Sequence, residues 1–137
     1  MNPIDTPPQG EPTLRVMPMP RDTNTAGDIF GGWLMSQVDM AGSVVAARRA
    51  AGRIATVAVK AFSFKAPVYV GDLVSLYAKV TGVGTTSLTV DVEVLAERGW
   101  RTAAFGEQVK VTEAILTYVA LDEEGKPRAV PTLGMAP

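Results

Sequence analysis

The stretch IFGGWLMSQVDMAGSVVAARRAAG, residues 29–52, decides the fold because it has the spacing of one long helix. Apolar residues recur in it at intervals of three or four, which is the helical period, and they include Leu34, Val38, Ala41 and Val45. Arginines near its end suit a helix C-terminus, and Gly52 suits the cap. Few charges come before Arg48, so we expect a helix that is mostly surrounded by protein.

The remaining segments carry the pattern of β-strands. The clearest is residues 87–96, where valines and a leucine alternate with polar residues, as in a strand with one dry face and one wet face. Similar runs occupy residues 56–64, 73–80 and 109–120, and a shorter one occupies residues 14–17. The apolar phase changes within the first and last of the longer runs, which predicts a β-bulge or a change of face.

Connections typical of hairpins join the last three strands, so the sheet is expected to be antiparallel. The predicted fold class is α+β, with an antiparallel five-stranded sheet wrapped around one long central helix. A chain of 137 residues is expected to form one domain. Six of the ten prolines lie in residues 1–20. We therefore predict a flexible Pro-rich tail at residues 1–11 and a single domain at residues 12–137.

The charge balance narrows the class of partner. Thirteen basic and 14 acidic residues give a net charge of −1, which argues against a broad nucleic-acid-binding surface. No apolar run approaches the roughly 18 residues that cross a membrane, so no membrane span is expected. The first residues lack the basic start and the apolar stretch of a signal peptide, which favours the cytoplasm.

The sequence contains no Cys and no His. These absences exclude disulfides, thiolate metal sites, a Cys nucleophile and His-based catalytic triads. We expect neither a metal nor an organic cofactor. If the protein is an enzyme, a carboxylate, amide, hydroxyl or backbone dipole must carry the chemistry.

The predicted helix contains one acidic residue, Asp39, two turns after its glycine-rich start. An ionised carboxylate in an apolar setting must be solvated, paired, protonated or used, and an edge position beside water or an Arg is about as plausible as a catalytic role. The start itself is Phe30-Gly31-Gly32, where free N–H groups would suit an oxyanion. Steric need in a tight turn is the alternative reason for two glycines. Asp39 and the helix start share one face and could line one groove.

Two polar loops are further candidates. Asn24, in the loop before the helix, carries an amide that could position a water or a carbonyl, although an Asx turn is its commoner role. A second polar turn could present hydroxyls and amides to a phosphate, although such a turn more often simply joins a hairpin. It consists of Gly84, Thr85, Thr86 and Ser87. Basic residues such as Arg98 are expected on the solvated surface.

The stretch DTNTAGDIFGGWLMSQVD, residues 22–39, resembles the signature of the YciA-type acyl-CoA thioesterases of the hotdog superfamily. Residues 55–72, 83–94 and 111–131 resemble the same family in the same order. The resemblance implies a hotdog fold and hydrolysis of acyl-CoA to a free acid and coenzyme A. It also implies a homodimer that assembles into a homohexamer, as a trimer of dimers.

The resemblance implies roles for particular residues. Asp39 would be the general base or nucleophile, Asn24 would face it from another chain, and Gly31-Gly32 would supply the oxyanion donor. Phe30 and the turn at residues 84–87 would contact the substrate. Many relatives carry an Arg at the position of Thr85, so the coenzyme A nucleotide is expected to be held differently here. The alternatives are a non-catalytic acyl-CoA-binding protein on the same scaffold and, disfavoured by the absence of His, a hotdog dehydratase.

Overall fold

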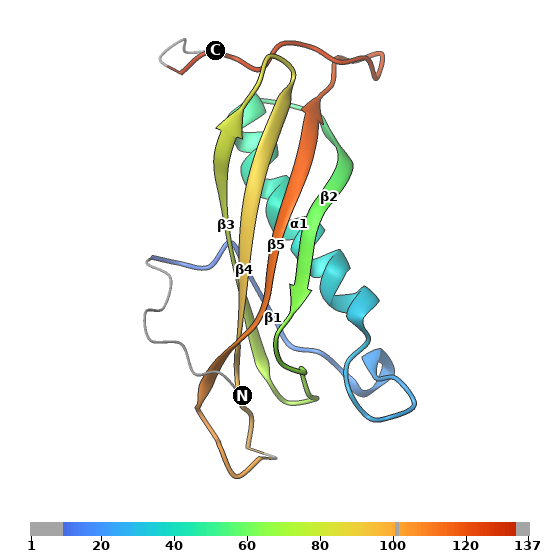
Figure 1. Cartoon of the computed structure of the whole chain (residues 1–137), viewed down its shortest axis with the longest axis vertical. Coiled ribbons are helices and arrows are strands. Elements are labelled where there is room, and N and C mark those ends of the chain that lie inside the picture. Colours follow the sequence, from blue (N-terminus) through green and yellow to red (C-terminus); the bar gives the residue numbers. More distant parts are fainter. Residues whose placement is uncertain (1–9, 101, 134–137) are drawn as a thin grey trace.

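The computed structural model describes residues 10–100 and 102–133, which form one long helix, one short 3-10 helix and five strands (Figure 1). In chain order these are β1 (Leu14–Val16), η1 (Pro20–Asp22), α1 (Gly31–Ala50), β2 (Ile54–Phe64), β3 (Leu73–Val83), β4 (Ser87–Glu97) and β5 (Gln108–Ala120). Every predicted strand and the predicted helix are present. Most of the predicted tail, residues 1–9, lies outside the described residues, and the domain boundary stays a prediction.

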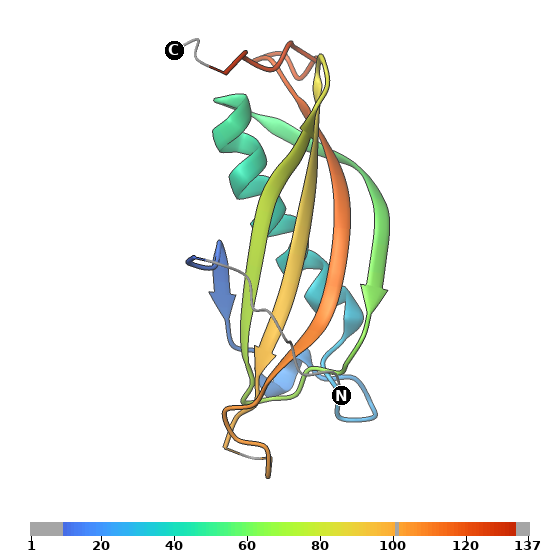
Figure 2. The ribbon, with the colours of Figure 1, turned by 60° about the vertical axis from the view of Figure 1, so that its left-hand side comes forward.

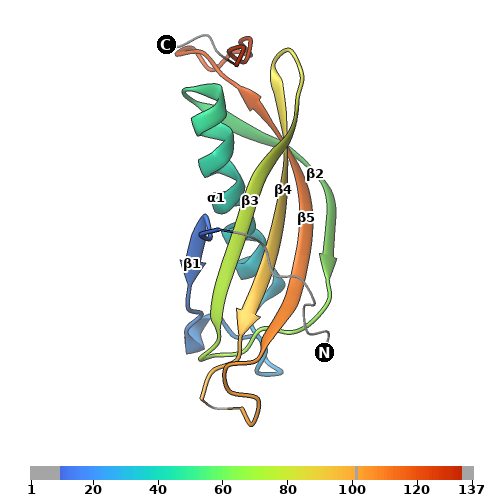
Figure 3. The ribbon, with the colours of Figure 1, turned by 90° about the vertical axis from the view of Figure 1, so that its left-hand side faces the viewer.

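The strands form one antiparallel sheet in the order β1-β3-β4-β5-β2. Consecutive strands β3, β4 and β5 are neighbours, and β2 lies beyond β5 at one edge. The sheet curves around α1, which lies against its concave face (Figures 2 and 3). The predicted architecture of one helix within a five-stranded antiparallel sheet is therefore confirmed.

Both predicted changes of apolar phase correspond to irregularities in strand pairing. The register between β2 and β5 shifts after Thr56 and again after Val59. The register between β4 and β5 shifts between Val94 and Leu95, so that Val111 of β5 has no direct partner on β4. Each extra residue turns the following side chains to the other face and adds local twist. The bulges thus let long strands follow the curve around the helix.

Only one face of α1 is buried in the single chain, which corrects the expectation that protein surrounds the helix. The buried residues meet the inward face of the sheet and are Leu34, Val38, Ala41, Gly42, Ala46 and Ala50. On the opposite face Met35, Met40 and Val44 are 41%, 48% and 36% exposed. The helix has few charges because one of its faces is buried against the sheet. No second layer among the described residues covers its other face, because the sheet lies on one side only.

The end of α1 differs by one residue from the prediction. Ala51, not Gly52, takes the left-handed conformation, with φ of 54°. Arg128 lies over this end and its Nη2 donates a hydrogen bond of 2.7 Å to the Ala50 carbonyl. A Cβ at position 52 would lie 2.8 Å from that same nitrogen. Glycine is therefore suited to position 52 because it leaves room for the guanidinium that caps the helix.

Candidate active site

A groove of about 470 Å³ opens beside the start of α1. Three of the predicted site residues, Asn24, Phe30 and Gly31, line it. The end of β2 and the segment that follows it form another wall, from Phe64 to Val68. Gly32 is not among the lining residues. The fold thus places the polar loop before the helix, the helix start and the end of an edge strand around one space.

The start of α1 presents two free backbone amides. The N–H groups of Gly31 and Gly32 have no acceptor among residues 10–100 and 102–133, and the N-cap residue, Phe30, offers no side-chain cap. The next amide, that of Trp33, already donates to the Phe30 carbonyl at 3.1 Å. Unpaired amides at the positive end of a helix dipole favour a negative charge. The geometry suits an oxygen atom that gains charge during a reaction.

The two glycines have different surroundings. A Cβ at Gly31 would lie 3.1 Å from the ring of Phe64, so packing against β2 favours glycine there. A Cβ at Gly32 would meet nothing within 4 Å. Neither glycine has a positive φ. The steric alternative therefore explains Gly31 but not Gly32, where a bare backbone leaves the amide open to approach.

Asn24 organises its own loop. Its Oδ1 accepts hydrogen bonds from the backbone N–H groups of Ala26 and Asp28, at 2.9 and 3.1 Å. This is the Asx-turn role that the sequence offered as the alternative. The side-chain Nδ2 has no partner among the described residues and is the atom left to act in the groove. Asn24 can therefore serve the groove as a donor while its oxygen holds the loop.

Asp39 lies further along α1 and does not line the groove. Its Oδ1 accepts a hydrogen bond of 2.7 Å from the hydroxyl of Thr56. The Tyr118 hydroxyl lies 3.0 Å from the same oxygen and 3.0 Å from the backbone carbonyl of Asp39. A single chain therefore does not place the carboxylate and the helix-start amides in one groove, although both lie on α1.

Tyr118 reaches Asp39 from the fully buried face of β5. Burial and, next, the hydrogen bond to Asp39 raise the pKa of the Tyr118 phenol. The hydroxyl thus stays protonated and available as a donor. A Cβ at Gly42 would lie 2.3 Å from this hydroxyl, so a glycine one turn after Asp39 makes the contact possible. Sequence analysis missed both hydroxyl partners of Asp39, because their proximity depends on the pairing of β2 with β5.

The predicted turn at residues 84–87 connects β3 to β4 at the end of the molecule away from the helix start (Figure 1). The Gly84 N–H donates to the Ser87 carbonyl at 2.8 Å, which closes a hairpin. The carbonyls of Thr85 and Thr86 accept hydrogen bonds from Val130 and Ala120. The single chain does not bring this turn to the groove, and its backbone serves the hairpin that the sequence offered as the alternative.

Comparison with known proteins decides the family. Residues 26–103 match the model of the thioesterase superfamily. The acyl-CoA thioester hydrolase YciA of Salmonella typhimurium is 47% identical over 134 residues, which cover 98% of this chain and 100% of that protein. The chain belongs to the thioesterase superfamily. The predicted resemblance to the YciA-type thioesterases is thereby confirmed.

Solved structures agree with this assignment. A hexameric broad specificity acyl-coenzyme A thioesterase superposes with a TM-score of 0.86 at 42% identity, covering 94% of this chain and 86% of that one. A hexameric hotdog fold thioesterase of Campylobacter jejuni superposes with a TM-score of 0.84 at 43% identity, covering 89% and 91%. This thioesterase-superfamily chain has the predicted hotdog fold.

The described residues of this superfamily member form neither a metal-binding cluster nor a membrane-spanning helix. Residues 10–100 and 102–133 contain no group of three or more carboxylate, His or Cys side chains arranged to hold a metal ion. Within the same ranges, no helix combines the length and the apolarity needed to cross a membrane.

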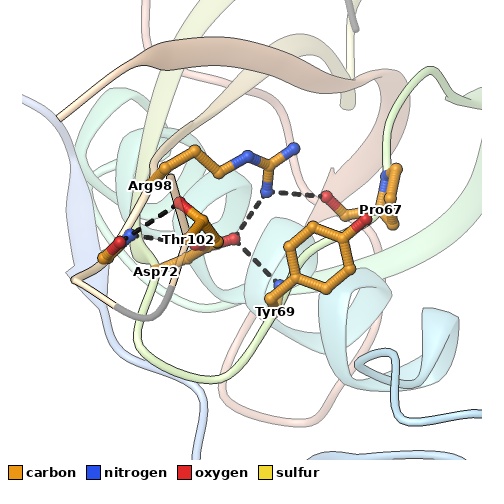
Figure 4. A network of polar contacts seen from close by, with 6 residues as sticks. Pro67, Tyr69, Asp72, Arg98 and Thr102 are labelled. Carbon is orange, nitrogen blue, oxygen red and sulfur yellow. Dashed lines mark hydrogen bonds and ion pairs between the residues drawn. The ribbon is translucent and has the colours of Figure 1, made fainter. Parts of the chain in front are cut away.

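A buried ion pair contacts the backbone that forms one wall of the groove in this thioesterase-superfamily member. Asp72 and Arg98 are 0% and 1% exposed, which corrects the prediction that Arg98 is solvated. Arg98 Nη1 donates to Asp72 Oδ2 at 2.6 Å and to the Pro67 carbonyl at 3.0 Å (Figure 4). The guanidinium also lies over the ring of Tyr69, 4.8 Å from its centroid. The sequence shows no local signal for this pair, because its members come from separate loops.

The ion pair acts on the groove through the backbone. Pro67 lines the groove, and its carbonyl is the one that Arg98 holds. The next carbonyl, that of Val68, accepts a hydrogen bond of 3.0 Å from Ile29, two residues before α1. A chain of hydrogen bonds thus links the buried charges to the wall of the groove and to the helix start.

We predict that Asp72→Ala lowers the free energy of unfolding by about 3–5 kcal/mol, because it leaves the Arg98 charge buried without its carboxylate. Arg98→Met should also destabilise, and the double variant should lose less than the sum of the two. Glu113→Ala is the matched control, because its 3.6 Å pair with Lys65 is exposed, and it should cost less than about 1 kcal/mol. Urea unfolding at fixed protein concentration measures all four. Additive losses in the Asp72 and Arg98 variants would contradict the coupling.

The raised pKa of Tyr118 predicts a loss of stability at alkaline pH. Unfolded chains lose the phenol proton near the ordinary pKa of 10.0, whereas the folded protein keeps it. The stabilisation is complete below that pH and is lost as the pH rises toward the folded pKa. Urea unfolding between about pH 9 and about pH 11 should show a shallower fall in stability for Tyr118→Phe than for the wild type. Identical slopes would show that Tyr118 does not titrate as described.

Proposed function

We propose that this protein hydrolyses acyl-CoA thioesters to a carboxylic acid and coenzyme A, with Asp39 as the acting carboxylate. The observation that carries the proposal is that the two oxygens of the Asp39 carboxylate differ. Oδ1 accepts hydrogen bonds from two hydroxyl groups, whereas Oδ2 has no partner among the described residues. It lies on the helix of a thioesterase-superfamily fold whose sequence offers neither His nor Cys. The relatives named acyl-CoA thioester hydrolase support the substrate class.

The reaction requires two functions at one carbonyl. The Oδ2 atom of Asp39 removes a proton from water as the water attacks the thioester carbon, or attacks that carbon directly. In either route the carbonyl oxygen becomes negative, and the N–H groups of Gly31 and Gly32 stabilise it. In the first route the C–S bond then breaks, and the proton that Asp39 took from water passes to the coenzyme A thiolate. In the second route the C–S bond breaks to leave an anhydride between the acyl group and Asp39; a water molecule then hydrolyses this anhydride to the carboxylic acid, which restores Asp39 and supplies the proton for the thiolate. Asn24 Nδ2 orients the water or the carbonyl as a hydrogen-bond donor.

The active site requires two chains. Asp39 follows Gly32 by seven residues, which is about 10 Å along the helix axis, and the carboxylate does not line the groove of its own chain. We infer that a second chain brings its Asp39 to the groove formed by Asn24 and the helix start of the first. A two-fold symmetric pair then contains two equivalent sites.

The exposed apolar face supports this pairing. The edge strand β2 is exposed or partly exposed along its whole length, and an unpaired edge favours addition of a further strand. The exposed large apolar residues on β2 and on the neighbouring face of α1 include Met35, Met40, Val44, Val57, Val59 and Phe64. We propose a homodimer along this edge, and three such dimers in a homohexamer, as the hexameric solved relatives suggest. The cytoplasmic location and the contact of residues 84–87 with coenzyme A stay predictions.

We expect Asp39→Ala to lower the rate of thiol release from acyl-CoA by about 10²–10⁴-fold, because it removes the general base or nucleophile. The variant should still fold and bind coenzyme A, as measured by circular dichroism and calorimetry. Asp91→Ala is the matched control, because Asp91 belongs to the outer side of β4, away from α1. A wild-type rate in Asp39→Ala would refute the assignment, and a wild type that binds acyl-CoA without releasing thiol would be a non-catalytic binder.

Subunit mixing tests whether two chains share each site. Asn24→Ala and Asp39→Ala should each lose most of the activity alone, whereas a mixed dimer would contain one site with both residues intact. Random exchange makes half of the dimers mixed, so activity should return to about a quarter of the wild-type rate. Mass spectrometry of differently tagged chains verifies the exchange. No recovery after verified exchange would place both residues in one chain's site.

A further inference from the structure

The groove beside the helix start has an apolar floor that belongs to the core. Ile29, Leu34 and Val68 line the groove, and all three side chains are buried members of the hydrophobic core. Gly31 lines the same groove, and its N–H has no acceptor among the described residues. An apolar surface thus lies directly beside an amide that suits a carbonyl oxygen. Such a surface favours a ligand group that gains by leaving water.

A thioester of coenzyme A offers two different arms to this groove. The acyl arm of a simple substrate is a hydrocarbon, whereas the pantetheine arm contains amides that need hydrogen-bond partners when they leave water. Backbone groups of the groove wall are already paired. The Ile29 N–H donates to the Val68 carbonyl at 3.0 Å, and the Pro67 carbonyl accepts from Arg98 at 3.0 Å. The groove therefore suits the acyl arm better than the pantetheine arm.

Phe64 limits the width of the groove at the helix start. Phe64 and Gly31 both line the groove, and ring atom Cζ of Phe64 lies 3.1 Å from the position that a Gly31 Cβ would take. The tip of the ring is thus next to the backbone whose N–H would hold the carbonyl oxygen of the substrate. A substituent on the acyl carbon beside the carbonyl would therefore meet the ring, whereas a straight chain has only hydrogens at that carbon.

We propose that Phe64 is a specificity-determining residue that selects straight-chain acyl groups over acyl groups branched at the carbon beside the carbonyl. The inference rests on the proposed thioesterase function and adds which arm lies in the groove and which side chain restricts it. Phe64 contacts the substrate but neither donates nor accepts a proton. One methyl group more or less in an apolar pocket changes kcat/KM by about 10–200-fold.

The test compares butyryl-CoA with isobutyryl-CoA, which contain the same number of carbons and differ in branching beside the carbonyl. We expect the wild type to favour butyryl-CoA by about 10-fold or more in kcat/KM, and Phe64→Ala to remove most of that preference. Phe64→Leu should give an intermediate preference. Phe62→Leu is the matched control, because the Phe62 ring neighbours that of Phe64 on β2 but does not line the groove. That variant should keep the wild-type preference.

Free coenzyme A distinguishes the two arms, because it carries the pantetheine arm without an acyl group. Its inhibition constant should be the same for Phe64→Ala and the wild type. An equal loss of affinity for free coenzyme A and for both substrates would place the pantetheine arm in the groove and overturn the inference. Phe64 also belongs to the apolar face proposed for the homodimer, so light scattering checks the mass of each variant. If Phe64→Ala changes the mass, Phe64→Leu decides, because it keeps an apolar side chain.

The outcomes separate this inference from the proposed function. An unchanged preference in both Phe64 variants, with thiol release that still depends on Asp39, would overturn selection by Phe64 and leave the function intact. A wild type that hydrolyses both substrates equally well would also overturn the selection. A wild type that releases no thiol from any straight-chain acyl-CoA would contradict the proposed function itself.

Discussion

A single helix packed against one curved sheet is the constraint on which the rest of this structure depends. Five strands cover one face of α1, and no second layer in the described chain covers the other. The helix therefore buries small and medium side chains on one side and exposes methionines on the other. Asp39 lies at the boundary between these faces, where hydroxyls of the sheet reach one of its oxygens. Burial on one side and openness on the other give this carboxylate its two unequal oxygens.

The local pattern of apolar residues was sufficient to predict the helix and the strands, because the period of each is visible within a short window of sequence. Shifts in apolar phase also located the irregularities in β2 and β5, but not the register shift between Val80 and Gly82 in β3. The contacts that build the site depend instead on register and on loops far apart in sequence. Thr56 lies beside Tyr118 because β2 pairs with β5. Arg98 can be buried because Asp72, on another loop, accepts a hydrogen bond from its guanidinium. The two residues of each contact lie too far apart in the sequence for a local pattern to predict it.

Because the sequence has no His and no Cys, the proposed site uses a carboxylate, which is a weaker base than imidazole. A carboxylate can serve as base or nucleophile, but only when its orientation and charge are controlled by neighbours. Here hydroxyl donors hold one oxygen, while unpaired amides at a helix start provide the positive partial charge. The Asp39 carboxylate and the N–H groups at the helix start lie about two turns apart on the same helix. Each chain thus carries both of the groups proposed to act on the thioester, and Asp39 does not line the groove at the helix start of its own chain.

That separation connects stability to assembly. The helix start is tied to the Val68 carbonyl, and the neighbouring Pro67 carbonyl is tied to the buried Arg98. The carboxylate, by contrast, is tied to the paired strands β2 and β5. Different contacts within one chain therefore hold the helix start and the carboxylate. In the proposed two-chain site, a second chain would bring its held carboxylate against the helix start of the first, so association would require little reordering of these groups.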